Sequence, residues 1–389
     1  MKLNILLSVA TLATLTLVGC GSDNTDDTPV QTLPEDNAKV LLGKKFYSDK
    51  TLSKNGTMSC ATCHSLEEGL VDPRSTSKVF GASLGDNAVS IGDRNAPTAA
   101  YATFSPAFHF DDVEGLYIGG QFLDGRASDL KAQAKGPFLN PLEMGMPNAA
   151  AVVNKVRENS TYVIELKNIY GNDIFDNNDN AYDSIAESIA SFEKSKTFSP
   201  FDSKFDKYLA GEYTLTESEN RGMLIYSNEE DELGAGKCTL CHPITKDGAN
   251  TPLMTDYSYD NLGVPINIAL RNQNGQTGRL DSGLLGNPTV TDTTLEGSFK
   301  VSSLRNIAVT GPYMHNGVFK ELKTVVHFYN TRDTGGINPE TGAAWEVGEF
   351  HNGRNQDELG DLGLTSTDED DLVAFLKTFT DTKYESLIK

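Results

Sequence analysis

Two short motifs carry the chemistry of this 389-residue chain. Both have the pattern Cys-x-x-Cys-His, and they are Cys60-Ala-Thr-Cys63-His64 and Cys238-Thr-Leu-Cys241-His242. The spacing is typical of c-type haem attachment, in which two thiols bond to the haem and the adjacent His ligates its iron. A zinc or redox Cys-x-x-Cys pair is the alternative. Two chance matches are rare with five Cys and six His, so the sequence predicts two covalently bound haem c groups.

The N-terminus predicts export. Lys2 precedes an apolar run over 5–18 that is too short to span a membrane, and small residues lead to Cys20. We expect a lipoprotein signal peptide over 1–20, lipidation of Cys20, and a polar tether over 21–36. A soluble periplasmic protein is the alternative. Both place the chain in the periplasm, where the remaining four Cys serve haem attachment and leave no thiol for a disulfide.

The charge balance indicates the kind of partner. The net charge is −21 and the pI is near 4.6, so the chain lacks the basic surface that nucleic-acid binding requires. An acidic surface favours encounter with a basic electron-donor protein, such as a small cytochrome c or a cupredoxin. Solubility alone is the competing explanation. Membrane contact is expected only through the lipid on Cys20.

Each motif follows a predicted helix. Val40, Leu41, Leu42 and Phe46 form a helical stripe before the first motif. The capping box Thr216-Glu-Ser-Glu219 opens a helix through Tyr226 before the second. The repeated order indicates an internal duplication.

Two further helices are expected, over Ser184–Lys196 and after a cap at Ser366-Thr-Asp-Glu369. Long loops over 72–100, 243–296 and 330–362 separate the helices. The predicted fold is mainly α, with two c-type cytochrome domains that each surround one covalently bound haem and carry long loops. The domains are expected over 37–210 and 211–389.

Further motifs resemble one known family. They are Gly120-Gln-Phe-Leu-Asp-Gly-Arg-Ala127, Gln133-Ala-Lys-Gly-Pro137, Asn140-Pro-Leu-Glu-Met144, Leu304-Arg-Asn-Ile307 and Gly311-Pro-Tyr-Met-His-Asn-Gly317. Their order and spacing resemble the bacterial di-haem cytochrome c peroxidase and MauG family from about residue 38 to the C-terminus. The resemblance implies a peroxidatic haem in the N-terminal domain and an electron-transfer haem in the C-terminal domain.

The resemblance implies that Gln133 and Glu143 lie in the distal pocket of the first haem. Cleavage of the peroxide O–O bond needs a group that takes a proton from one oxygen and returns it to the other. A carboxylate in an apolar pocket can be tuned for that transfer, and an amide can orient peroxide. The alternative is that Glu143 is a surface carboxylate beside a proline turn.

The first haem is expected to be open. Family peroxidases usually carry a blocking His on a loop after the first motif, but this chain has no His between His64 and His109, and Ser75–Asn87 offer no strong ligand. An open, high-spin first haem resembles MauG. His109 is the alternative ligand, although a packed or second-shell histidine is the preferred interpretation.

The distal ligand of the second haem is predicted at Tyr329. The family places this ligand fourteen residues after the His that corresponds to His315, and a Tyr there resembles MauG. A phenolate is a hard, anionic ligand that favours oxidised iron. His327 competes, but in a helix the two side chains project about 200° apart, so only one can face the iron. Met314 is expected to pack.

One residue departs from the family pattern. Leu123 occupies the position at which family members commonly have a Trp between the haems, and the only Trp, Trp345, lies far along the chain. Leu cannot be oxidised, so electron transfer between the haems is expected to be direct or to pass through groups such as Phe122 or Tyr117.

The resemblance also implies one calcium ion between the domains. Asn95, Thr310 and Pro312 match the family positions that supply a side-chain oxygen and two backbone carbonyls. Oxygen ligands suit this hard cation. The alternative for Asn95 is a turn residue before Pro97.

These observations predict a di-haem cytochrome c peroxidase that reduces hydrogen peroxide to water with electrons from a small external donor. A MauG-like oxidase that modifies residues of a partner protein is the first alternative. A non-catalytic di-haem electron carrier is the second. The resemblance also implies a homodimer.

Overall fold

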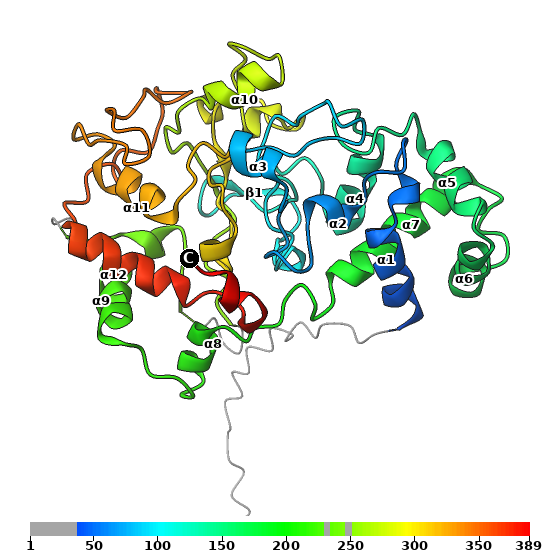
Figure 1. Cartoon of the computed structure of the whole chain (residues 1–389), viewed down its shortest axis with the longest axis horizontal. Helices are drawn as coiled ribbons and strands as arrows, with labels where there is room; N and C mark the ends of the chain where they lie inside the picture. The colour runs from blue at the N-terminus through cyan, green and yellow to red at the C-terminus, as the bar shows by residue number, and fades with distance from the viewer. Residues whose placement is uncertain (1–36, 229–233, 246–250) are drawn as a thin grey trace, which may run out of the picture. The chain divides into compact units, whose positions relative to one another are not determined.

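The computed structural model describes residues 37–228, 234–245 and 251–389 (Figure 1). The predicted signal peptide, the tether and Cys20 lie outside the described residues. None of the helices within these ranges is long and apolar enough to cross a membrane.

The structure is mainly helical, as predicted, with short strands. The helices are α1 (Ala38–Ser48), α2 (Cys60–Cys63), α3 (Ser75–Phe80), α4 (Leu130–Leu139), α5 (Ala149–Arg157), α6 (Ser160–Tyr170), α7 (Asn178–Glu193), α8 (Lys204–Leu209), α9 (Glu217–Ser227), α10 (Ile268–Gln273), α11 (Leu322–Thr331) and α12 (Ser366–Lys377). Two antiparallel hairpins pair β1 (His109–Asp111) with β2 (Leu116–Ile118) and β3 (Tyr259–Asp260) with β4 (Phe299–Lys300).

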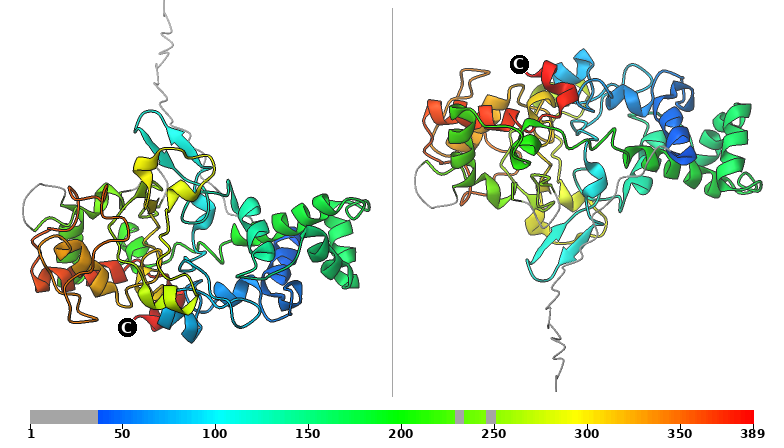
Figure 2. Two further views of the ribbon diagram at one scale, coloured as in Figure 1. Left: turned by 90° about the horizontal axis from the view of Figure 1, so that it is seen from above. Right: turned by 90° about the horizontal axis from the view of Figure 1, so that it is seen from below.

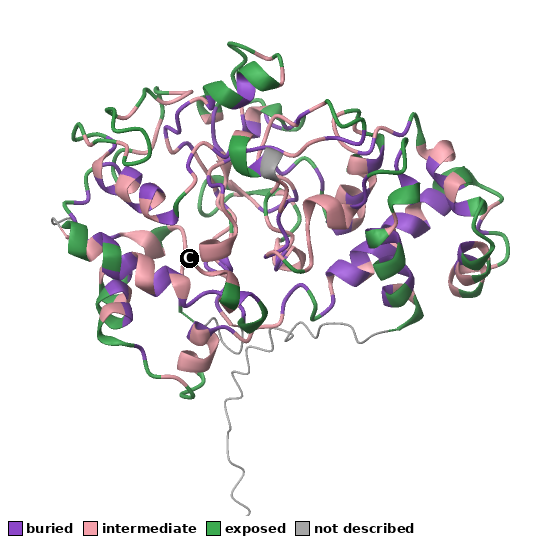
Figure 3. Cartoon of the chain, in the orientation of Figure 1, coloured by how far each residue is buried: buried purple, intermediate pink, exposed green. Residues whose placement is uncertain are grey.

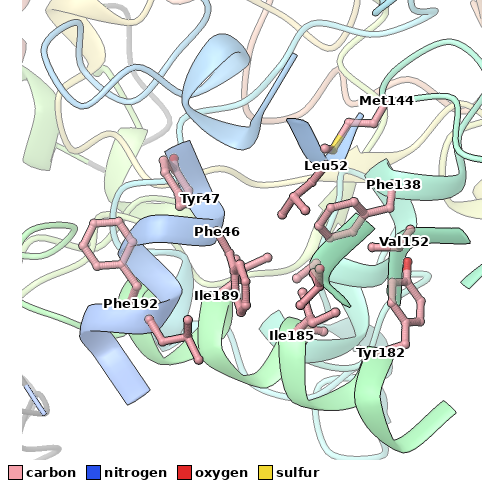
Figure 4. Close-up of a cluster of buried hydrophobic side chains, with 14 of the residues drawn as sticks. Phe46, Tyr47, Leu52, Phe138, Met144, Val152, Tyr182, Ile185, Ile189 and Phe192 are labelled. Carbon is pink, nitrogen blue, oxygen red and sulfur yellow. The ribbon is translucent and has the colours of Figure 1, made fainter. Parts of the chain in front are cut away.

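The first hydrophobic core forms where α1 crosses α7 (Figure 4). Most residues of α7 are buried, including the predicted face of Ile185, Ile189 and Phe192 (Figure 3). The helices approach closely at Gly43, where an added Cβ would lie 1.8 Å from the Ser188 carbonyl oxygen. Only glycine permits this crossing, which sets α1 directly before the first motif.

The second core repeats this arrangement with α9 and α12. At Gly222 an added Cβ would lie 2.0 Å from the carbonyl oxygen of Asp371. Phe375 and Phe379 then pack edge-on against Tyr226, with ring centroids 5.3 and 5.9 Å away. A glycine crossing therefore stands before each motif, as an internal duplication predicts.

The predicted helices exist, but their ends differ in detail. In the first stripe Leu41 is 49% exposed, whereas Val40, Leu42 and Phe46 are buried. The helix predicted over Ser184–Lys196 begins six residues earlier, after the N-cap Asn177, and ends at Glu193.

The capping box at Thr216 is confirmed, since Thr216 Oγ1 accepts from the Glu219 N–H. The cap of the last helix was predicted one residue too late: Thr365 is the N-cap, and its hydroxyl accepts from the Asp368 N–H. Either Thr365 or Ser366 can cap, and burial of Leu372 and Phe375 against α9 selects the register.

The long loops contain short elements that the sequence did not predict. Helix α3 lies within 72–100, and β3, α10 and two 3₁₀ turns lie within 243–296. Helices α3 and α10 contact one another, so the two halves of the chain meet there as well. The described residues belong to one compact unit. Along the chain, Phe198 is the last buried residue of the first core and Phe205 is the first buried residue of the second. The division into two domains stays a prediction.

Candidate haem-binding and peroxide sites

The first motif holds its histidine by both the ring and the backbone. Ser59 and Thr62 cap the short helix α2, and His64 follows at its end. The His64 Nδ1 lies 3.2 Å from the Leu70 carbonyl, and the Tyr47 hydroxyl donates to the His64 carbonyl at 2.9 Å. A carbonyl at Nδ1 places the proton there and leaves Nε2 as a ligand. Burial lowers the pKa of His64, which keeps the ring neutral.

The second motif repeats this geometry with other residues. Nδ1 of His242 lies 2.8 Å from the carbonyl of Met254. The Tyr226 hydroxyl donates to the His242 carbonyl at 2.5 Å. Burial also lowers the pKa of His242. Both rings therefore present a neutral Nε2, as a proximal haem ligand requires.

The cysteines fit haem attachment better than a zinc site. Burial raises the pKa of Cys63 to about 11 and that of Cys238 to about 12, and it raises the pKa of Cys60 and Cys241 as well. Zinc binding needs thiolates and three or more ligands. In the described ranges no group of three or more His, Cys, Asp or Glu side chains is arranged to hold a metal ion. Two protonated thiols and a nearby neutral imidazole suit thioether formation.

A cavity of about 350 Å³ lies beside the second motif. Cys241 and His242 form part of its wall, and Tyr329, Leu123 and Lys300 line it from other elements. The cavity thus extends from the second motif to the loop that carries the family motif at 120–127. Its mainly apolar wall fits a haem face.

Tyr329 and His327 point to different surroundings. Both lie on α11, as the helical interpretation requires. Tyr329 lines the cavity, whereas the His327 Nδ1 lies 2.7 Å from Oε1 of Glu369 on α12. Burial raises the pKa of the Tyr329 phenol, so a phenolate there needs a compensating cation such as ferric iron.

Gln133 and Glu143 lie on and just after α4. The Glu143 carboxylate accepts from Nδ2 of Asn140 at 2.7 Å, and its charge raises the pKa of both Cys60 and Cys63. The carboxylate is therefore close to the first motif. Burial raises its own pKa. Gln133 is half-buried, and no described residue forms a hydrogen bond to its side-chain amide.

His109 is not packed, contrary to the sequence interpretation. It lies exposed on β1, and its Nδ1 lies 2.9 Å from the carbonyl of Ala107. Figure 2 shows the β1–β2 hairpin (cyan) projecting from the surrounding helices. In the segment where the family carries a blocking His, α3 instead packs against α10.

The aromatic side chains considered for electron transfer between the haems lie in different surroundings. Leu123 is buried and lines the cavity. The Phe122 ring lies under the Arg126 guanidinium, 3.7 Å away, where the positive charge disfavours oxidation of the ring. Tyr117 stacks on Phe108 in the hairpin. Trp345 packs edge-on against Phe328 in the second core, and Met314, as expected, also packs there.

The three predicted calcium ligands lie together. The Asn95 side chain reaches the Pro312 carbonyl, with Nδ2 and O 2.5 Å apart, and Thr310 lines the same cavity. The Asn95 N–H donates to the His315 carbonyl at 2.7 Å. Asn95 therefore joins two distant segments rather than only forming a local turn.

Two tyrosines that hold the motif histidines were not predicted from the sequence. Tyr47 and Tyr226 each lie four residues after the crossing glycine, in Gly43-Lys-Lys-Phe-Tyr47 and Gly222-Met-Leu-Ile-Tyr226. They precede the first Cys of their motifs by 13 and 12 residues. The repeated Gly-x-x-x-Tyr was a usable signal.

Comparison with known proteins agrees with this geometry. The model of the family described as di-haem cytochrome c peroxidase matches residues 37–214. The chain is 43% identical to the methylamine utilization protein MauG of Paracoccus denitrificans, with 93% of each chain covered. It is 32% identical to the cytochrome c551 peroxidase of Nitrosomonas europaea, covering 82% of this chain and 81% of that one.

A solved structure supports the same assignment. The diheme peroxidase BthA from Burkholderia thailandensis matches with a TM-score of 0.82 and 29% sequence identity. The match covers 92% of this chain and 89% of that chain. With two equivalent Cys-x-x-Cys-His sites and relatives matched over nearly their full length, the chain belongs to the di-haem cytochrome c peroxidase family, which includes MauG.

Proposed function

We propose that the chain is a peroxidase that reduces hydrogen peroxide to water at its first haem site. The observation that supports this best is the half-buried Glu143 carboxyl, which has a raised pKa and acts on the pKa of the first motif's cysteines. Gln133 lies on the preceding helix α4, and its amide has no hydrogen-bond partner among the described residues. An electron carrier does not need such a pair.

Seven side chains would hold the two haems. Cys60 and Cys63 would attach the first, and Cys238 and Cys241 the second, while His64 and His242 would be the proximal ligands. Tyr329 would be the distal ligand of the second haem. Bound haem supplies the redox-active iron that the side chains alone cannot provide.

The raised pKa suits Glu143 for proton transfer. Burial brings the pKa of the carboxyl closer to neutral pH, so the group can accept a proton from peroxide and return it to the departing oxygen. The Asn140 amide holds one carboxylate oxygen and thereby fixes the direction of the other. Gln133 would orient peroxide by hydrogen bonding.

Electrons would come from a small basic protein, a cytochrome c or a cupredoxin, attracted by the net charge of −21. The reaction would take place in the periplasm, with the chain anchored through lipidated Cys20. A homodimer is part of the proposal from family resemblance.

A MauG-like oxidase that modifies a partner protein is the second candidate. The phenol of Tyr329 in the cavity and the 43% identity to a MauG favour it. Leu123 speaks against a shared oxidation state of the two haems, because its side chain cannot carry an electron hole. Isolation of a modified Trp, Tyr or Cys in a partner protein after peroxide treatment would decide for this function.

We also propose one calcium ion at Asn95, Thr310 and Pro312. The Asn95 side chain already meets the Pro312 carbonyl there, and rotation of the amide would direct its oxygen to the same point. Chelator treatment should release about one calcium per chain and change the haem spectrum, whereas a protein without calcium would contradict the site.

The peroxidase proposal is tested by Glu143→Gln, which keeps the shape of the side chain and removes its proton chemistry. Peroxide turnover should fall by about 10²–10⁴-fold, while haem content stays unchanged. Glu158→Gln at the exposed end of α5 is the matched control and should retain full activity. Full turnover by Glu143→Gln would remove the assigned role.

A further inference from the structure

Lys300 stands at the meeting point of the cavity and the loop at 120–127. Its backbone N–H donates to the Leu123 carbonyl at 2.9 Å, and β4 pairs it with Tyr259. Its side chain lines the cavity beside the second motif, and Nζ donates to the Gly120 carbonyl at 2.6 Å. In the described part of the chain no carboxylate lies within salt-bridge distance of Nζ.

Two acidic groups on this side of the cavity are paired with arginines. Arg94 bridges Asp281 and Asp124, with N–O distances of 2.6 and 2.7 Å, and Arg126 also binds Asp124, at 2.7 Å. Three further carboxylates line the cavity, those of Asp260, Glu349 and Glu358. None of these groups forms a salt bridge with Lys300 in the described part of the chain.

An ammonium group that is partly withdrawn from water and has only a neutral acceptor is costly. Lys300 is half-buried, and burial lowers its pKa to about 8, although the charge of Asp124 opposes this change. A lysine in such surroundings is stabilised by an anion within hydrogen-bond distance. Among the described residues Lys300 has no such anion.

We propose that Lys300 binds a propionate carboxylate of the haem that His242 holds. The proposal rests on the proposed haem site, because that haem would fill the cavity that Lys300 lines. Haem carries two propionates, so it can supply the carboxylate partner that Lys300 lacks. The ammonium then keeps the carboxylate ionised at neutral pH and raises the reduction potential of the second haem, since a nearby positive charge disfavours ferric iron.

The test compares Lys300→Met with Lys320→Met in the haem-loaded protein. Lys320 is a matched control, because its Nζ also donates to a glycine carbonyl, Gly317, but it is absent from the cavity wall. Redox titration would follow the low-spin signal of the second haem and the high-spin signal of the first. Lys300→Met should lower the potential of the low-spin haem and make it pH-dependent near neutral pH. Lys320→Met should leave both potentials unchanged.

Three results would overturn the proposal: unchanged potentials in Lys300→Met, a shift confined to the first haem, or an equal shift in Lys320→Met. Lys300→Arg keeps the charge and should retain the wild-type potential; a shift equal to that of Lys300→Met would contradict the assignment. If neither Lys300 variant binds haem, the pH dependence of the second haem's potential is measured in the wild-type protein. A propionate paired with Lys300 predicts a constant potential between about pH 6 and 8, and a changing potential would contradict the proposal. Two haem spectra in the wild-type protein would uphold the haem sites in every case.

Discussion

The two halves of this chain build their proximal sides alike and their distal sides differently. In each half a glycine lets two helices cross, and a tyrosine four residues later donates to the carbonyl of the motif histidine. Each histidine also directs Nδ1 at a backbone carbonyl. The repeated scaffold thus holds the two motif histidines in the same way, and this side cannot distinguish the roles of the halves.

The two halves differ in the side chains on their distal sides. In the N-terminal half, Gln133 lies on α4, and the half-buried Glu143 carboxyl after α4 is close enough to the first motif to affect the pKa of its cysteines. In the C-terminal half α11 directs the Tyr329 phenol into the cavity. A carboxyl with a raised pKa suits proton transfer to a small molecule, whereas a phenol in the cavity suits a ligand position. This difference is the reason why we propose peroxide chemistry for the first half.

The largest expected effect in the second half comes from Tyr329→Met. Exchange of an anionic phenolate for a neutral thioether should raise the potential of the second haem by a sizeable fraction of the about 0.8 V that axial ligands span. His327→Met is the control, because His327 contacts Glu369 instead of the cavity. A large shift in His327→Met with none in Tyr329→Met would reverse the ligand assignment.

The helix crossings should respond next. Gly43→Ala and Gly222→Ala each force a methyl group against a backbone carbonyl, so each should reduce the free energy of unfolding by about 1–3 kcal/mol. Urea unfolding followed by circular dichroism measures the change. Gly92→Ala controls for the general effect of the substitution, because Gly92 has no left-handed backbone and no atom lies closer than 3.8 Å to the added Cβ. Equal losses in all three variants would contradict a specific role for the crossings.

The tyrosine bonds should have smaller effects. Tyr47→Phe and Tyr226→Phe each remove one hydrogen bond to a motif histidine carbonyl, worth about 1 kcal/mol of stability. If the halves are equivalent on their proximal sides, the two losses should agree within about 0.5 kcal/mol. A loss in only one variant, measured by urea unfolding, would show that the resemblance of the two sides is only geometric.

A further effect is a pH dependence where the halves meet. Asp381 accepts hydrogen bonds from Tyr101 and Asn306, and burial raises its pKa to about 6. The unfolded chain releases this proton near pH 4, so the free energy of unfolding should fall as pH rises from about 4 to about 6. Asp381→Asn should remove that slope, and Asp370→Asn on the surface should not. An unchanged slope in Asp381→Asn would exclude this carboxyl as its source.

The sequence predicted features that depend on local spacing. Short patterns predict the motif cysteines and histidines, the capping box at Thr216 and the buried face of α7. The structure confirms the capping box and the buried face. The α12 cap was misplaced because Thr365 and Ser366 are equally good caps, and only packing on α9 decides between them. The exposure of His109 was missed because it depends on a hairpin formed by three-residue strands.

Long-range pairing was beyond the sequence. The contacts of Glu143 with Asn140 are local, but its proximity to Cys60, some eighty residues earlier, comes only from the fold. Likewise, Asp124 is bound by Arg94 and Arg126 and forms no salt bridge with Lys300, which only the folded structure shows. These contacts between residues far apart in the sequence arise only from the three-dimensional packing.

We propose that the first haem site is open and that Glu143 and Gln133 assist peroxide cleavage there. The most direct test mixes hydrogen peroxide and a reduced small cytochrome c with the fully ferric protein, without prior reduction. We predict immediate oxidation of the cytochrome, together with a change in haem absorption. No turnover and no spectral change until the protein is first reduced would show that the first site is blocked, and would contradict the account.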